Sequence, residues 1–162
     1  MVGYWNDSKQ SYLKDGWLRS GDTGCESLDG YLYLCGREDD VINVGGRKVY
    51  PKEVEDALRR HQGVADCVCV GIRDLDNITG CRIKALVMAK ARREILPSFR
   101  ELSEFLVGKL DSYKIPIAYE WVSSIPKNAS GKVQRHLMKE LARSTGAIRD
   151  PSPAGAYRFA KR

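Results

Sequence analysis

The sequence predicts an α+β fold in which a small sheet packs with about three helices, preceded by a β-hairpin appendage. Three stretches repeat apolar residues at helical spacing, and short runs rich in Val, Ile, Leu and Cys lie between them, as is typical of strands. Hydrophobic residues make up 43% of the 162-residue chain and charged residues 30%. This composition predicts a packed core, and the length suits one ordinary domain or a small domain with an appendage.

The sequence of the N-terminal part indicates short strands. Residues 25–36 predict a hairpin about Asp29-Gly30, because an Asp-Gly pair between strands favours a tight turn. An isolated hairpin is marginally stable in water, so we expect this part to be the end of something larger. The acidic run Glu38-Asp39-Asp40 then interrupts the pattern, and we place a domain boundary there. The predicted parts are residues 1–38, an α+β domain over 39–145, and a loose basic tail over 146–162.

The α+β domain begins with a short strand at residues 41–44. Gly45-Gly46-Arg47-Lys48 predicts a turn, and a helix then starts at Pro51, with Glu53 and Glu55 in its first turn. Two apolar strands follow at residues 66–72 and 82–89.

The second predicted helix opens with Ser98 and Glu101, which fit a capping box. A short strand at residues 119–122 leads to a last helix over 134–143. The helix that opens at Ser98 is expected to turn inward Phe99, Leu102, Phe105, Leu106 and Leu110. The last helix is expected to turn inward Leu137, Met138 and Leu141.

Charge and cysteine content limit the class of protein. The five cysteines are an odd number with no zinc-ligand spacing, which favours a reducing, cytoplasmic location and no metal site. No apolar run approaches the roughly 20 residues that a membrane helix needs, so we expect no membrane span. The net charge of +6 fits anionic partners, which include nucleotides and coenzymes as well as nucleic acid.

Three motifs together resemble those of the adenylate-forming enzymes, a superfamily of acyl-CoA synthetases, peptide-synthetase adenylation domains and luciferases. They are Gly16-Trp17-Leu18-Arg19-Ser20-Gly21-Asp22, a glycine- and acid-rich stretch over residues 36–55, and Pro126-Lys127-Asn128-Ala129-Ser130-Gly131-Lys132-Val133-Gln134-Arg135. The resemblance covers about residues 3–142 and is to the C-terminal domain of these enzymes. It implies that the appendage is the last part of a large N-terminal adenylation domain, which this sequence lacks.

The resemblance implies an ATP-dependent acyl-CoA synthetase, an acid-thiol ligase that converts a carboxylic acid to an acyl-adenylate and then to a thioester of CoA. ATP, Mg²⁺ and CoA would serve the complete enzyme, with none bound tightly to this part, which alone we expect to be inactive. The acceptor could instead be a carrier protein. A non-catalytic basic binding module is a further alternative, although no nucleic-acid recognition motif is present and we expect no nucleic acid.

Three residues would act on the nucleotide side. Lys132 is the candidate catalytic lysine, because a mobile ammonium can offset the charge that builds as a carboxylate meets the α-phosphate. By itself, Ser-Gly-Lys also occurs in inert surface loops. Asp22 would accept hydrogen bonds from the ribose hydroxyls, or cap a turn. Arg37 would contact ribose or phosphate, or form a salt bridge with Glu38 or Asp40.

The resemblance makes Asp39 the hinge about which the domain rotates between the two steps. The CoA-binding face would comprise Gly45, Gly46, Arg47 and Lys48, where glycines allow a ligand to approach the backbone closely. The alternatives are a plain β-turn and solvated surface charge. Asn43 stands where the family usually has a lysine, so no role is assigned to it.

Overall fold

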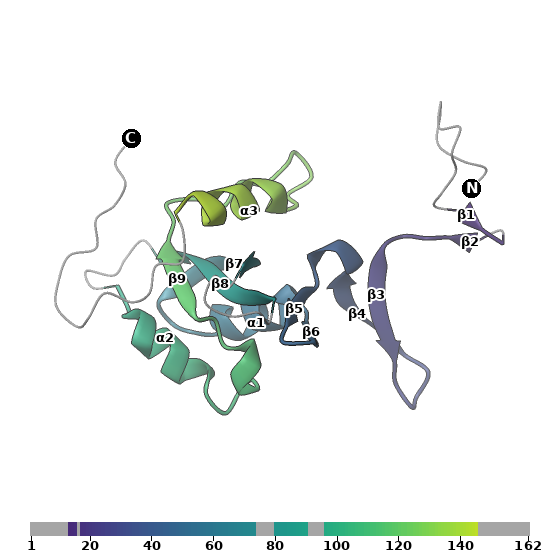
Figure 1. Cartoon of the computed structure of the whole chain (residues 1–162), viewed down its shortest axis with the longest axis horizontal. Helices are drawn as coiled ribbons and strands as arrows, with labels where there is room; N and C mark the ends of the chain where they lie inside the picture. The colour runs from purple at the N-terminus through teal and green to yellow at the C-terminus, as the bar shows by residue number, and fades with distance from the viewer. Residues whose placement is uncertain (1–12, 16, 74–79, 91–95, 146–162) are drawn as a thin grey trace. The chain divides into compact units, whose positions relative to one another are not determined.

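Figure 1 shows a computed structural model that describes residues 13–15, 17–73, 80–90 and 96–145. The chain divides into two compact units, Met1–Asp40 and Val41–Arg162, and we describe each by itself. Helices and strands alternate irregularly with mostly antiparallel pairing, which confirms the α+β class. The predicted tail over 146–162 lies outside the described residues, and the domain limits stay predictions. Within the described part, no helix is long and apolar enough to cross a membrane.

The strands described in the first unit form two antiparallel hairpins. β1 (Leu13–Lys14) pairs with β2 (Trp17–Leu18), and β3 (Asp22–Glu26) pairs with β4 (Leu32–Arg37). The predicted hairpin is therefore present, but its loop has three residues, because Ser27 N donates to Tyr31 O across it at 2.9 Å. At Asp15 and over residues 17–40, where burial is described, no residue of this unit is buried. A short 3₁₀ helix, η1 (Glu38–Asp40), ends the unit.

In the described residues of the second unit there are three α-helices and a central sheet, which Figure 1 shows together. In chain order its elements are β5 (Ile42–Val44), β6 (Arg47–Val49), α1 (Pro51–Arg59), β7 (Val64–Arg73), β8 (Cys81–Ala89), α2 (Phe99–Leu106), the 3₁₀ helix η2 (Ser112–Lys114), β9 (Ala118–Trp121) and α3 (Arg135–Ser144).

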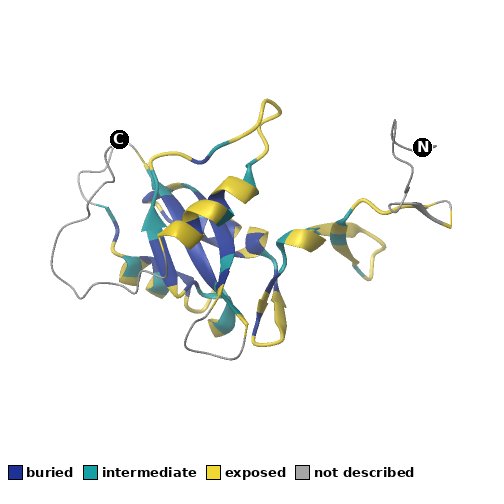
Figure 2. Ribbon diagram, turned by 45° about the horizontal axis from the view of Figure 1, so that its top comes forward, coloured by how far each residue is buried: buried dark blue, intermediate teal, exposed yellow. Residues whose placement is uncertain are grey.

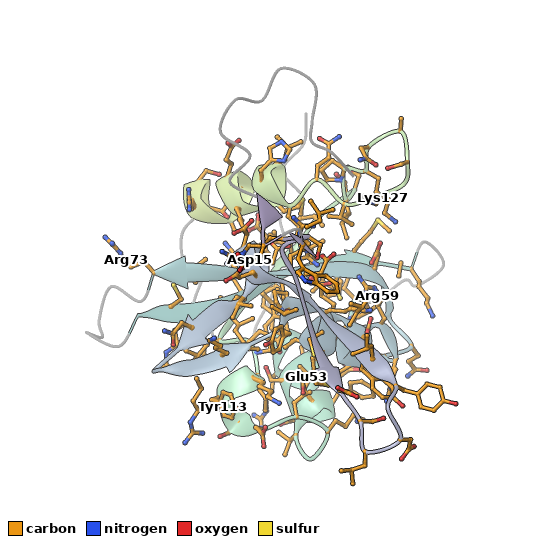
Figure 3. All side chains as sticks on the ribbon, turned by 90° about the vertical axis from the view of Figure 1, so that its right-hand side faces the viewer. Asp15, Glu53, Arg59, Arg73, Tyr113 and Lys127 are labelled. Atoms are coloured by element: carbon orange, nitrogen blue, oxygen red, sulfur yellow. The ribbon has the colours of Figure 1, made fainter. Side chains whose placement is uncertain are left out.

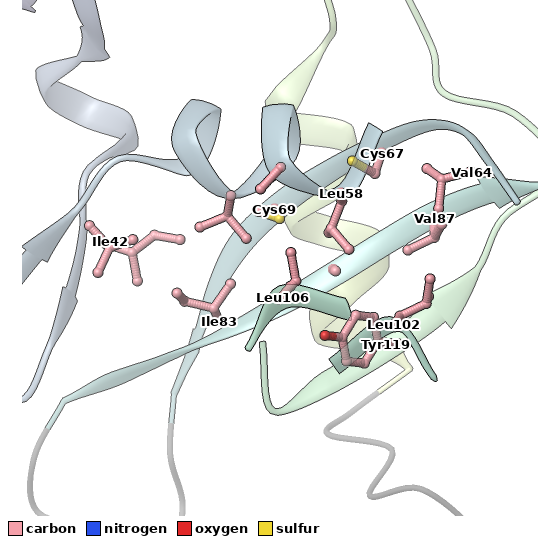
Figure 4. Close-up of a cluster of buried hydrophobic side chains, with 14 of the residues drawn as sticks. Ile42, Leu58, Val64, Cys67, Cys69, Ile83, Val87, Leu102, Leu106 and Tyr119 are labelled. Carbon is pink, nitrogen blue, oxygen red and sulfur yellow. The ribbon is translucent and has the colours of Figure 1, made fainter. Parts of the chain in front are cut away.

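The sheet has the strand order β7-β8-β9 and separates two cores. β7 and β8 are antiparallel, whereas β8 and β9 are parallel, with α2 in the connection between them. Alternate residues of each strand face opposite sides. One core lies against α1 and α2 (Figure 4), and the smaller core lies against α3. Figure 2 shows the buried sheet between helices whose outer faces are exposed.

The starts of the first two helices follow local signals in the sequence. Pro51 occupies the first turn of α1, as predicted. The Oγ of Ser98 accepts a hydrogen bond from Glu101 N at 3.0 Å, which confirms Ser98 as the cap of α2. The Glu101 carboxylate lies 3.3 Å from Nε2 of the buried His61. Glu101 thus links α2 to the end of α1.

The structure confirms Met138 on the inward face of α3 but contradicts the prediction for Leu137 and Leu141. Met138 and Ala142 are each 1% exposed, whereas Leu137 is 39% and Leu141 37% exposed. Each residue turns the helix by about 100°, so the buried stripe lies one residue further along than expected. The small side chain of Ala142 lets the helix approach the sheet closely. There Nζ of the fully buried Lys84 donates to Ala142 O at 3.3 Å and lies 3.0 Å from Glu120 Oε2.

Candidate functional site

Lys132 lies in a tight loop between β9 and α3, on the strand-like arm just before its base. Lys127 and Val133 form an antiparallel bridge at its base, and Asn128 N donates to Lys132 O at 2.9 Å. Gly131 has φ of +80°, a value that glycine adopts without strain, and the chain reverses there. Lys132 itself is exposed. The backbone of the loop is thus held while its lysine side chain faces solvent.

An ion pair fixes the first end of this loop. Lys127 Nζ lies 3.1 Å from Asp66 Oδ2, and Asp66 Oδ1 accepts a hydrogen bond from Arg59 Nε at 2.9 Å. Burial alone would raise the pKa of Asp66, but hydrogen bonds from Arg59, Lys127 and the Cys67 N–H lower it below its usual value. Figure 3 shows Lys127 and Arg59 on the same side of the unit. The loop is therefore tied to α1 and β7 through one carboxylate.

A second ion pair, between a buried carboxylate and a half-buried guanidinium, fixes the other end of the loop. Arg135, the first residue of α3, places Nη1 and Nη2 at 2.7 and 2.9 Å from the two carboxylate oxygens of Glu55 on α1. Glu55 is 2% exposed. This two-point contact is the strong geometry for a guanidinium with a carboxylate. It joins two helices that lie on opposite faces of the sheet.

Glu55, Arg135 and Arg59 also bind backbone groups on the free edge of β7. Glu55 Oε1 accepts from Cys69 N at 2.9 Å, and Arg135 Nη1 donates to Cys69 O at 3.4 Å. Arg59 Nη2 donates to Cys67 O at 3.0 Å. Unpaired edge groups would otherwise be buried without partners or be open to pairing with another chain. The side chains that support the loop are therefore also required by the sheet.

The predicted CoA-binding face is a hairpin on another part of the unit. Gly45 and Gly46 have φ of +57° and +83°, and β5 and β6 close on them as a two-residue turn. The predicted four-residue turn is thus wrong in one respect, since Arg47 and Lys48 lie on β6 rather than in the turn. A Cβ atom on either glycine would have no neighbour within 4 Å, so the turn is open to solvent.

Cations and one aromatic ring lie beside this hairpin. The Arg47 guanidinium lies 4.7 Å from the ring centroid of Tyr113, within cation–π range. Lys114 Nζ lies 2.7 Å from Glu53 Oε1, and this hydrogen bond raises the pKa of Lys114 above its usual range. In Figure 3, Tyr113 and Glu53 lie toward the end of the unit opposite Lys127. The structure therefore does not bring the glycine hairpin and the lysine loop together.

Asp22 and Arg37 pair with each other in the first unit. Arg37 Nη1 lies 3.3 Å from Asp22 Oδ1, with both side chains partly exposed on β3 and β4. The alternative partner Glu38 is bound by Arg19, whose Nη2 lies 2.7 Å away. A carboxylate and a guanidinium thus stand side by side on an exposed hairpin, a pairing able to meet hydroxyl and phosphate groups.

Asp39 is the central residue of η1 and is exposed. On one side, Glu38 N donates to Gly21 O at 2.8 Å, which fixes Glu38 to the first unit. On the other side, Ile42 is 4% exposed and belongs to the core of the second unit. The chain between the two units is therefore anchored on both sides within three residues of Asp39.

Several supporting residues are absent from the sequence-based prediction of the site, namely Glu55, Asp66, Lys127 and Arg135. Lys127 and Arg135 belong to the same motif as Lys132, and Glu55 belongs to the glycine- and acid-rich motif, so their position in motifs was a signal. Their pairing was not predictable, because Glu55 and Arg135 are 80 positions apart.

The fold and motifs are those of the adenylate-forming enzymes. The structure resembles o-succinylbenzoate CoA synthetase from Bacillus subtilis in complex with an acyl-adenylate, with a TM-score of 0.78 and 32% identity over 86% of this chain and 28% of that chain. It also resembles an anthranilate CoA ligase in complex with anthranoyl-AMP, with a TM-score of 0.79 and 33% identity over 91% of this chain and 29% of that one.

Residues 53–132 match the AMP-binding enzyme C-terminal domain, and this part of the chain belongs to that family. The chain is 41% identical over 142 residues to the fatty acid–[acyl-carrier-protein] ligase ScoC of Streptomyces coeruleorubidus, covering 86% of this chain and 27% of that protein. It is 37% identical over 142 residues to a long-chain-fatty-acid–CoA ligase of Bacillus subtilis, covering 86% and 25%. The chain thus spans about a quarter of the length of these relatives.

Replacing Asp66 with Asn should change how stability depends on pH. The lowered pKa of Asp66 means that the folded state favours the ionised form, so the stabilisation is present above pH about 4 and is lost as pH falls through the folded-state pKa. We expect D66N to lower the free energy of unfolding by about 1–2 kcal/mol at pH 7. The difference from wild type should shrink below pH 4.

Urea titrations followed by circular dichroism at pH 7, 5 and 3 measure this difference. Glu140→Gln, at an exposed position on α3, provides the control. A difference between D66N and wild type that is the same at all three pH values would contradict the role given to the ionised Asp66 carboxylate, which binds both Arg59 and Lys127.

Proposed function

We propose that this chain is the C-terminal part of an ATP-dependent acid-thiol ligase, an acyl-CoA synthetase. In the first step a carboxylate oxygen of the substrate bonds to the α-phosphorus of ATP, and the bond to pyrophosphate breaks. In the second step a thiol attacks the acyl carbon, and AMP leaves. The observation that carries this proposal is the exposed ammonium group of Lys132. Its loop is held by ion pairs at both ends, in a domain that matches the AMP-binding enzyme family.

Lys132 would serve the first step. Two anions meet when the carboxylate approaches the α-phosphate, so a positioned cation stabilises the transition state and aligns the groups. The site is completed by a large N-terminal adenylation domain, to which the exposed first unit would belong. Asp22 would contact the ribose hydroxyls there, and Arg37 the ribose or phosphate.

The second step would use the glycine hairpin. Gly45 and Gly46 leave open space for the pantetheine arm of CoA, and Arg47 and Lys48 carry charge suited to its phosphates. Because this hairpin and Lys132 lie on different parts of one unit, a rotation would exchange them at the site. Asp39 would be the pivot, since both of its flanks are anchored.

ATP, Mg²⁺ and CoA are proposed for the complete enzyme. The described residues include no group of three or more His, Cys, Asp or Glu side chains that could hold a metal ion, so we assign no metal ligand to them. A carrier protein as acceptor is a second candidate, favoured by the 41% identity to an acyl-carrier-protein ligase. The family match favours either ligase over a basic binding module.

A chimera tests the proposal. This chain would replace the matching segment of the 2-succinylbenzoate–CoA ligase of Bacillus licheniformis, to which it is 38% identical over 139 residues. We expect the chimera to catalyse carboxylate-dependent pyrophosphate exchange, and this chain alone to catalyse none. A folded chimera without either half-reaction would contradict the proposal.

Lys132→Ala in that chimera should separate the two half-reactions. We expect pyrophosphate exchange to fall at least about 100-fold, because one preorganised charge contact contributes that much. Thioester formation from supplied acyl-adenylate should stay within about threefold, since it would use the other orientation. An equal loss in both assays would show that Lys132 is structural.

Asp39→Pro should lower the rate of the overall ligase reaction while leaving the rate of one half-reaction nearly unchanged. Proline fixes φ near −65° and removes one N–H, so a pivot at this residue would be restricted to one orientation. We expect an unchanged melting temperature, one half-reaction near the unsubstituted rate, and a reduced overall rate. If both half-reactions keep their rates, Asp39 is not the pivot.

A further inference from the structure

We propose that Asn128 is a positioning residue for Lys132, because its side chain sets the conformation of the lysine loop. This inference rests on the proposed function of Lys132. Asn128 is exposed and contributes nothing to either core, so its contacts serve only the loop.

Three donors converge on one atom of Asn128. Its Oδ1 accepts hydrogen bonds from Ser130 N at 3.1 Å, from Ser130 Oγ at 2.8 Å and from Lys132 N at 2.8 Å. Backbone N–H groups can only donate, so the side-chain atom that faces them must be the amide oxygen. An acceptor at this place is therefore what the loop requires.

The backbone of Asn128 completes the contact. Its N–H donates to Lys132 O at 2.9 Å, and its C=O accepts from Gly131 N at 2.9 Å. Lys132 is thus held by Asn128 through both its N–H and its C=O, while its side chain stays outside. These bonds fix the direction in which the Cα–Cβ bond of Lys132 points.

This arrangement matters because the loop has little else to hold its tip. Residues 127–132 are all exposed, and the two ion pairs to Asp66 and Glu55 act only at the base. If the Cα–Cβ bond of Lys132 pointed in a slightly different direction, the flexible side chain could still reach the site, but its ammonium group would be less well aligned with the reacting groups. A misplacement of about 1 Å can lower a rate about 100-fold.

Four variants in the ligase chimera test the inference. Asn128→Leu keeps the approximate size and removes the acceptor, whereas Asn128→Asp keeps an acceptor oxygen. Ser130→Ala removes one of the three donors, the hydroxyl. Glu140→Gln is the neutral control on an exposed part of α3. The readouts are kcat and KM of pyrophosphate exchange, the rate of thioester formation from supplied acyl-adenylate, and the melting temperature.

We expect N128L to lower the kcat of exchange about 10- to 100-fold, with KM and thioester formation within about threefold. N128D should recover exchange to within about fivefold of the unsubstituted chimera, and S130A should lose about fivefold or less. The melting temperatures should agree within about 2 °C, because the loop is exposed.

Three results would overturn the inference, and each differs from a failure of the proposed function. One is an N128L chimera that keeps its exchange rate although K132A has lost it. The second is an equal loss in N128L and N128D, and the third is an equal loss in both half-reactions. If K132A itself retains exchange, the function proposed for Lys132 fails instead.

Discussion

The free edge of β7 is the constraint on which the arrangement of the second unit depends. A strand at the end of a sheet needs partners for its backbone, and here Glu55 and Arg135 bind the N–H and C=O of Cys69 while binding each other. Removing Arg135 would leave the buried Glu55 carboxylate without its cation, which costs up to about 3–5 kcal/mol. An exposed pair such as Arg100–Glu104 contributes far less, because water and salt screen the two charges. The Glu55–Arg135 pair therefore determines where α3 begins relative to α1.

This constraint also explains how an exposed lysine can be held in place. Lys132 lies three residues before Arg135, and the other end of its loop is held to β7 through Asp66. The rigid base consists of sheet and helices, whereas the tip and the glycine hairpin are exposed. The rotation that we propose about Asp39 would need such a division between a fixed scaffold and open loops.

The sequence predicted what depends on local chemistry. The Pro51 and Ser98 helix starts and the position of the strands follow from turn, cap and spacing signals. The sequence predicted the wrong buried residues for part of α3, because Leu137 and Leu141 are more hydrophobic than Ala142. In the structure the helix lies close to the sheet, and the small side chain of Ala142 fits there. The pairing of Glu55 with Arg135 needs the fold, since an ion pair between distant residues leaves no periodic pattern. The site motifs were recognisable from the sequence. The role proposed for Asn128 follows only from the structure, where its side-chain oxygen accepts hydrogen bonds from backbone N–H groups of the loop.

Under the proposed function, the fold positions one ammonium group, that of Lys132, for the first step. The most direct measurement replaces Lys132 with Cys in the ligase chimera and compares two adducts, one that adds an aminoethyl group and one that adds a neutral methylthio group. The unsubstituted chimera, treated in the same way, accounts for reaction at the exposed Cys25. The account predicts that the aminoethyl adduct restores pyrophosphate exchange at least about tenfold over the neutral one. Equal exchange activity of the two adducts would contradict it.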